Sequence, residues 1–120
     1  MRSPINFQSK FKLFSDFWSP KVIAEMNNYQ FKLVKIKDEF INHRHIDTDE
    51  VFIVIDGSMS IEFTDKIVEI NKGEMIVVSK GEDHKPFASS ECKVLIIEPK
   101  GVINTGETIG GLTAEDNVCI

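Results

Sequence analysis

Three histidines and a glutamate are the side chains of this sequence best suited to hold a metal ion. His43 and His45 are two positions apart in a strand-like segment, so both imidazoles are expected to project from one face. Glu50 follows a polar bend, and His84 lies in a polar loop after a later apolar strand. Three nitrogen ligands and one oxygen ligand suit iron, manganese, nickel, copper or zinc better than calcium or magnesium. The pattern predicts one divalent transition-metal ion, and it does not identify which metal.

Asp47 and Asp49 are the alternative oxygen ligands in the same region. Aspartate favours bends because its side chain bonds to nearby backbone amides, so we interpret both residues as turn formers. The histidine pair by itself is equally compatible with an ordinary polar face. The metal interpretation is favoured because all the histidines and Glu50 lie just before or after apolar strands.

Length and composition indicate one folded, soluble domain. The chain has 120 residues, of which 42% are hydrophobic and 28% charged, values typical of globular proteins. Its apolar runs, such as Val51 to Ile55, are far shorter than the roughly twenty residues that cross a bilayer. The formal net charge is −5 and the lysines are scattered, which argues against a nucleic-acid partner. We therefore expect neither membrane nor nucleic-acid binding.

The cysteines and the first residues indicate a cytoplasmic protein without a disulfide framework. Cys92 and Cys119 are far apart and form no Cys-x-x-Cys motif. The opening residues, Met1 to Asn6, have no apolar stretch of the kind found in secretory signals. A cytoplasmic location is the resulting expectation.

The elements that must position these side chains are mostly strands. Apolar residues spaced by three and four from Phe7 to Trp18 predict a short leading helix that Pro20 would end. Asp56-Gly57 between two strand-like runs predicts a β-hairpin with a type I′ turn. The expected strands cover Val22 to Met26, Tyr29 to Ile36, Val51 to Ile55, Ser58 to Phe63, Lys66 to Ile70, Met75 to Val78 and Cys92 to Glu98.

This succession of strands predicts an antiparallel sandwich or barrel. Turns recur roughly every eight to twelve residues, and no helix alternates with the strands. Val51 to Ile55 is apolar throughout and is expected to be buried on both faces. We divide the chain into an N-terminal extension (1–20), a barrel domain (21–101) and a C-terminal tail (102–120). The tail contains Gly106, Gly110 and Gly111 and shows little periodicity, so it could be extended or packed on a partner.

The motif residues resemble those of the cupin superfamily. His43, His45, Glu50 and Gly57 match its first motif, and Gly73, Gly81 and His84 match part of its second. The stretch between the motifs, Ser58 to Lys72, is short, as in small bacterial cupins. Lys37, Ser79 and Ala88 depart from the usual glycine, proline and asparagine, and none of these positions holds metal in the family.

The resemblance implies a double-stranded β-helix, a jelly-roll-like barrel with a metal in its mouth, and frequently a homodimer. It also implies tight turns at the three motif glycines, where a Cβ is disfavoured. A dimer is further expected because a small barrel must cover the outer face of Val51 to Ile55. A second subunit or the chain's own segment from Phe7 to Trp18 could provide that cover.

Two kinds of function are compatible with these features. The first is a metal-dependent enzyme acting on a small molecule, of the dioxygenase, isomerase or epimerase type. The second is a non-enzymatic module that binds a small ligand or a structural metal. We find no Ser-His-Asp arrangement and no phosphate-binding glycine loop in the sequence. It therefore indicates no particular catalytic residue and no organic cofactor. Trp18 and Tyr29 are candidates to line a ligand pocket.

Overall fold

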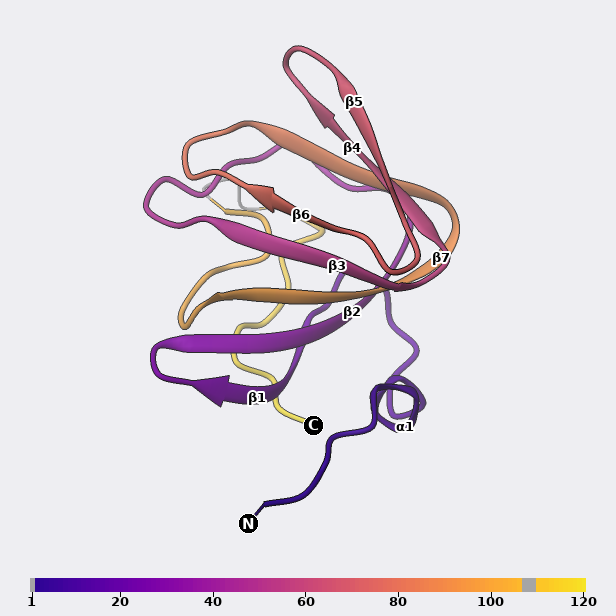
Figure 1. Cartoon of the computed structure of the whole chain (residues 1–120). Helices are drawn as coiled ribbons and strands as arrows, with labels where there is room; N and C mark the ends of the chain where they lie inside the picture. Colours follow the sequence, from indigo (N-terminus) through magenta and orange to yellow (C-terminus); the bar gives the residue numbers. More distant parts are fainter. Residues whose placement is uncertain (1, 107–109) are drawn as a thin grey trace.

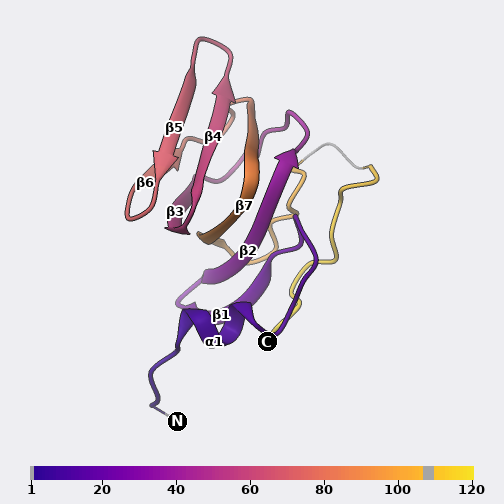
Figure 2. The ribbon, with the colours of Figure 1, turned by 90° about the vertical axis from the view of Figure 1, so that its right-hand side faces the viewer.

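The computed structural model describes residues 2–106 and 110–120 of the chain, and its architecture confirms the predicted all-β class with a short N-terminal helix. In the described residues the elements are α1 (Phe7–Phe11), β1 (Lys21–Met26), β2 (Tyr29–Glu39), β3 (Glu50–Asp56), β4 (Ser58–Phe63), β5 (Ile67–Asn71), β6 (Met75–Val78) and β7 (His84–Pro99). Figures 1 and 2 show the β4–β5 hairpin at one end of the barrel and α1 at the opposite end.

The long strand β7 organises the barrel. Strand β2 pairs with β7 along nearly its whole length, from Tyr29 opposite Pro99 to Glu39 opposite Phe87. On its other side, β7 pairs first with β4 and then with β3, while β6 and β5 complete the two edges. All these pairings are antiparallel, and they give the order β1-β2-β7-β3-β6 with β4 and β5 branching from β7. The two sheets of the jelly roll therefore share β7.

The predicted hairpin at Asp56-Gly57 is wrong. Strands β3 and β4 do not pair with each other; both run along β7, one after the other. Gly57 marks the bend at which the chain passes from one sheet to the other, with a φ of 84° that an L side chain rarely adopts. A Cβ at Gly57 would lie 3.0 Å from the carbonyl oxygen of Glu91 in β7. Asp56-Gly57 therefore forms a bend between two strands that both pair with β7, and not the turn of a hairpin.

The main core lies between the two sheets and follows the alternation of the strands. Phe52 and Val54 of β3 point into it, and the alternate residues of β3 are half-buried on the outer face, so the expectation of two fully buried faces is wrong. Phe11 of α1 packs outside the barrel with Leu33 and Leu95, and Ile53 borders this second cluster. The N-terminal segment therefore covers part of the outer face, one of the two covers expected from the sequence.

The N-terminal helix is shorter than predicted. It ends at Phe11, and Trp18 has a φ of 60°, which no α-helix contains. Asn6 caps the helix by accepting a hydrogen bond from the Ser9 N–H at 2.9 Å. The Trp18 N–H instead donates to the carbonyl oxygen of Lys35 in β2 at 2.9 Å. This contact with the sheet replaces the helical bonds that the apolar spacing predicted.

Strand β7 and the C-terminal tail also differ from the expectations. β7 begins at His84, well before Cys92, because residues 84–88 pair with β2 and β4. The end of the tail packs on the chain itself, since the Val22 N–H donates to Val118 O at 2.7 Å and the Ile120 N–H to Val22 O at 3.1 Å. Across the described residues, no helix has the length and apolar character needed to span a membrane.

Candidate metal centre

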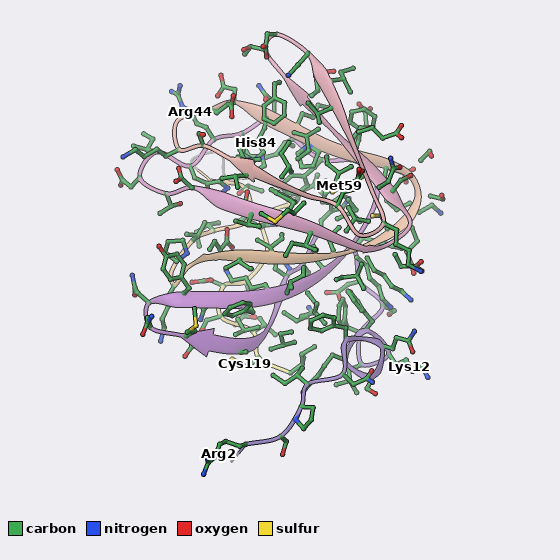
Figure 3. All side chains as sticks on the ribbon, viewed as in Figure 1. Arg2, Lys12, Arg44, Met59, His84 and Cys119 are labelled. Carbon is green, nitrogen blue, oxygen red and sulfur yellow. The ribbon has the colours of Figure 1, made fainter. Side chains whose placement is uncertain are left out.

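The structure brings His43, His45, Glu50 and His84 together. One ligand atom from each lies within 4.8 Å of the others, and all four side chains are buried. His43 and His45 come from the segment before β3, Glu50 is the first residue of β3, and His84 is the first residue of β7. Figure 3 shows His84 and Arg44 at the same end of the molecule, away from Lys12 beside α1.

Main-chain hydrogen bonds hold the first and last histidines side by side. The His43 N–H donates to His84 O at 3.0 Å, and the His84 N–H donates to His43 O at 2.9 Å. Their ring centroids are 4.2 Å apart. The segment that carries His43 and His45 is otherwise irregular and not the expected strand, so tertiary contacts, more than strand geometry, orient these two rings.

Backbone carbonyls also set the tautomers of two histidines. His43 Nδ1 lies 3.0 Å from Ile41 O, and His84 Nδ1 lies 2.9 Å from Glu82 O. A carbonyl oxygen only accepts hydrogen bonds, so each Nδ1 carries the proton and donates. The neutral rings then present the Nε2 lone pair, the arrangement that metal-binding histidines use.

Three buried polar atoms at the centre of the cluster lack a hydrogen-bond partner in the described residues. They are His45 Nε2, His84 Nε2 and Glu50 Oε1. Each nitrogen is 3.5 Å from Glu50 Oε1, too far for a good hydrogen bond. Unsatisfied buried groups are costly, and a cation between them would satisfy all three at once. The chemistry of these residues therefore fits a transition-metal ion.

Burial and the contacts within the cluster shift the pKa values of its residues. Burial, followed by the charge of His84, lowers the pKa of His43 to about 4, so His43 is neutral at neutral pH. Burial opposes ionisation of Glu50, but its contacts with His45 and His84 outweigh burial and hold its pKa well below the usual range. Burial opposes protonation of His84 as well, yet Glu50 and the Glu82 carbonyl raise its pKa. The site thus favours one ionised carboxylate beside imidazoles.

An apolar pocket lies beside the cluster, and His43 and Glu50 form part of its wall. Its cavity volume is about 30 Å³, and about 420 Å³ when the open space at its mouth is included. The rings of Trp18 and Phe40 are stacked at one side, with centroids 4.6 Å apart. The remaining lining residues are Pro20, Val34, Ile36, Phe52, Pro86, Val94, Ile96, Glu98 and Asn104. A small molecule in this pocket would be next to any ion held by the cluster.

Glu98 and Lys32 are polar residues of this region that the sequence analysis missed. Lys32 Nζ donates to Glu98 Oε1 at 2.8 Å, and both side chains are buried. The signal that could have found them is the period of two along each strand. Glu98 continues the core face that includes Val94 and Ile96 in β7, and a charged residue on such a face is unusual.

The other candidate residues from the sequence lie outside the cluster. Asp49 Oδ1 accepts a hydrogen bond from the Lys80 N–H at 2.9 Å, and neither Asp49 nor Asp47 belongs to the cluster. Trp18 lines the pocket as expected, whereas Tyr29 is exposed at the start of β2 and does not line it. The oxygen ligand offered by the structure is therefore Glu50.

The C-terminal tail contacts the region of the cluster at Gly106. This residue has a φ of 59°, and a Cβ there would overlap the carbonyl oxygen of Arg44 and lie 3.4 Å from His43 Cδ2. Only a glycine leaves space for this approach. Gly106 thus lies against the backbone between the first two histidines.

Comparisons with known proteins agree with this geometry. The family described as "Cupin domain" matches residues 32–98. A crystal structure of a cupin-2 domain containing protein from Shewanella frigidimarina is 58% identical, with a TM-score of 0.79, and the match covers 80% of this chain and 94% of that one. A Neisseria meningitidis protein is 30% identical with a TM-score of 0.75, covering 82% of this chain and all of that one.

Two curated proteins are also similar. The uncharacterised protein YdbB of Bacillus subtilis is 32% identical over 79 residues, which cover 65% of this chain and 70% of YdbB. A vicilin-like seed storage protein of Arabidopsis thaliana is 39% identical over 69 residues, 52% of this chain, but the match covers only 14% of that longer protein.

Proposed function

The chain belongs to the cupin family, and from this premise we propose that it binds one divalent transition-metal ion and acts on a small molecule as a metal-dependent enzyme. The proposed ligands are His43, His45, Glu50 and His84. The observation that carries the proposal is the set of three buried, unsatisfied ligand atoms at the centre of the cluster. Iron, manganese, zinc, nickel and copper are all compatible with this ligand set.

The pocket supports a role beyond structural metal binding. Four protein ligands leave one or two positions free on a five- or six-coordinate ion. His43 and Glu50 line the pocket, so a free position could face it. When bound, the ion would polarise an oxygen of the small molecule or bind dioxygen. The chain's own residues hold His43 and His84 in one tautomer and line the pocket with mostly apolar side chains.

A metal analysis tests this proposal directly. The protein is purified without a histidine tag, and its metal content is measured by mass spectrometry of the elements. We expect close to one transition-metal ion per chain, and none in the double variant His43→Ala/His45→Ala. A wild-type protein that takes up no transition metal, even from solutions of several salts, would refute the proposal.

The second candidate function is a non-enzymatic binding module. It is supported by the similarity to a segment of a seed storage protein, since storage requires no catalysis. The two candidates differ in turnover. An oxygen-consumption screen and a product screen on the metal-loaded protein, over small aromatic and sugar-like compounds, separate them. Saturable turnover that is lost in Glu50→Gln supports the enzyme, while binding without turnover supports the module.

We further propose that the protein is a homodimer. Met75 and Val77 lie on the edge strand β6 with 59% and 51% of their surface exposed, on the same face as Val51 and Ile53 of β3. The cluster around α1 covers Ile53, but it includes neither Met75 nor Val77. An exposed apolar edge strand is a hazard that proteins commonly cover, and a second copy of the chain is the occupant we propose. A cytoplasmic location stays a prediction of the sequence.

A further inference from the structure

We propose that Trp18 sets the size limit for molecules that enter the pocket beside the metal centre, and that Asn104 is the residue that positions Trp18. A molecule comparable in size with formate enters the pocket as it stands, whereas a molecule that contains a ring enters only when Trp18 is displaced. This inference rests on the proposed function, because it concerns access to the metal. It deepens that function by naming the residues that select a molecule by its size.

The pocket is too small for a ring in the arrangement that the structure shows. Its cavity volume is about 30 Å³. One water molecule needs roughly 10 to 15 Å³, so this cavity has space for about two, whereas an apolar cavity that binds benzene has about 150 Å³. A molecule that contains a ring can therefore reach the metal only if part of the wall moves.

The burial of the lining residues indicates which part of the wall can move. Trp18, Pro20 and Asn104 are half-buried, and every other residue that lines the pocket is buried. These three residues lie outside the strands, in the N-terminal extension and the C-terminal tail. Displacing a surface segment breaks few contacts, whereas displacing a core strand would disrupt the close packing between the sheets. The mouth of the pocket is therefore the part that opens.

Trp18 is the mouth residue with the greatest effect on the space beside the metal centre. Its ring stacks on Phe40 at a centroid distance of 4.6 Å, and the Phe40 ring packs edge-to-face with His43 at 5.3 Å. Two ring contacts thus join the mouth to a proposed metal ligand. The indole is also the largest of the three side chains at the mouth, so its position decides how wide the opening is.

Asn104 holds Trp18 in place with a single side chain. Its Nδ2 donates to Trp18 O and to Leu112 O, both at 2.9 Å, and its Oδ1 accepts from the Ala114 N–H at 2.8 Å. The amide therefore ties the N-terminal extension to two points of the C-terminal tail. Only an amide offers both donors and an acceptor in one group of this size; a carboxylate lacks the donors.

The backbone of Trp18 is strained in this position. Its φ of 60° lies in the left-handed region, where a bulky side chain is rarely found. Such a conformation persists only when the surrounding structure enforces it. Here the Trp18 N–H donates to Lys35 O and its Nε1–H to Lys37 O, each at 2.9 Å. Displacing Trp18 would release the strain, which lowers the cost of opening the pocket.

The test compares two ligands that differ in size. The protein is loaded with cobalt(II), whose visible absorption bands change when a ligand coordinates, and its cobalt content is measured first. The probes are formate and benzoate, which share the carboxylate and the negative charge and differ by a phenyl ring. In the wild type we expect benzoate to bind with a Kd roughly tenfold or more above that of formate.

Trp18→Ala identifies the residue that limits the size. Removing the indole makes room for the phenyl ring, whose burial then favours benzoate, so the ratio of the two Kd values should fall roughly tenfold or more. The matched control is Phe17→Ala. This neighbouring ring is 40% exposed and lies outside the pocket lining, so its removal should keep the wild-type ratio. If Trp18→Ala fails to fold, Trp18→Leu keeps an apolar side chain at the mouth and allows the same comparison.

Asn104→Ala tests the positioning role. Loss of the hydrogen bond to Trp18 O should lower the Kd of benzoate roughly fivefold and leave that of formate unchanged, whereas a general loosening of the fold would weaken both ligands. Trp18 is the single tryptophan of the chain, so quenching of its fluorescence by acrylamide reports its exposure without any metal. Quenching should increase in Asn104→Ala and stay unchanged in Asn28→Ala, at an exposed position between β1 and β2.

The outcomes separate this inference from the proposed function. A protein that takes up no cobalt refutes the proposed function, and the acrylamide measurement still tests whether Asn104 positions Trp18. A cobalt-loaded protein that binds neither probe, binds both equally, or keeps the same ratio in a folded Trp18 variant retains the metal site and overturns the size limit. Unchanged quenching and unchanged benzoate affinity in Asn104→Ala overturn the role of Asn104.

Discussion

The main chains of His43 and His84 are joined by two reciprocal hydrogen bonds, of 3.0 and 2.9 Å, although the residues are far apart in the sequence. This bridge places the segment before β3 against the first residue of β7. It makes the relative position of two proposed ligands a property of the backbone, not of side-chain rotamers alone. A preorganised pair of this kind reduces the ordering that a metal ion must bring about when it binds.

Metal binding should stabilise the fold. A ligand present at a hundredfold its Kd contributes about 2.7 kcal/mol, which for a domain of this size corresponds to a rise in Tm of about 10 °C. We expect this rise when zinc or manganese is added to metal-free wild-type protein, measured by scanning calorimetry. His43→Ala/His45→Ala should show no rise, whereas Asp47→Ala, at an exposed position outside the cluster, should behave as wild type. A rise that persists in the double variant would contradict the assigned ligands.

The metal-free protein should lose stability in acid because of His43. Its pKa is about 4 in the folded state, against the ordinary value of 6.5 for the unfolded chain. Between these values the unfolded state binds the proton and the folded state does not, so stability falls as pH drops below 6.5. From pH 7 to pH 5 this contribution amounts to about 2 kcal/mol.

Urea unfolding of wild type and His43→Asn at both pH values, with a chelator present, measures that contribution. The wild type should lose about 2 kcal/mol more than the variant. The raised pKa of His84 acts in the opposite direction, since its stabilisation is present at low pH and lost as pH rises through the raised pKa. That contribution is common to both proteins to first order. Equal losses in the two proteins would show that His43 is not held neutral.

Gly57→Ala should cost more stability than Gly73→Ala. The two glycines have nearly the same φ, 84° and 85°, so the backbone strain is matched. A Cβ at Gly73 meets nothing within 4 Å, whereas a Cβ at Gly57 meets the backbone of Glu91 and Cys92. We expect losses of about 1 kcal/mol at Gly73 and about 2 to 3 kcal/mol at Gly57, measured by urea unfolding. Equal losses would mean that β7 yields easily at this contact.

Gly106→Ala should weaken metal binding. The added Cβ would press on the carbonyl of Arg44, the residue between His43 and His45, and disturb the orientation of both rings. Changes next to metal ligands typically lower metal affinity by roughly 10- to 100-fold. Competition with a chromophoric chelator measures the affinity. Gly110→Ala is the control, because a Cβ there meets nothing within 4 Å and should leave the affinity unchanged.

The proposed dimer predicts a mass of about twice the 13.6 kDa of the chain in multi-angle light scattering. Replacing Val77 by glutamate should shift the protein to a monomer, because it places a charge on the exposed edge of β6. Lys66→Glu, in the β4–β5 turn, is a control charge change that should leave the dimer intact. The dimer would be refuted if the wild-type protein stays monomeric at a concentration of about 100 µM.

Local pattern was a good guide where a residue's role depends on its immediate neighbours. The strand predicted from Ser58 to Phe63 is β4, and a turn in which Asn27 has a φ of 55° joins the strands predicted on either side of it. Which strands pair was harder to predict from the sequence, because β3 and β4 could pair with each other or with β7 with the same alternation of residues. Glu98 was overlooked for a related reason: the last strand was interpreted from its apolar residues, and the pocket that Glu98 lines is assembled from distant segments.

The sequence by itself determined the class of the fold and the four side chains with metal-binding chemistry, because residue type and the period of two are local properties. Only the tertiary structure decided that these side chains meet, that Asp49 turns away to Lys80, and that the pocket contains a buried acid with a free oxygen. Those features depend on the register of β7 against β2, β3 and β4, which is set by the packing of all the strands together.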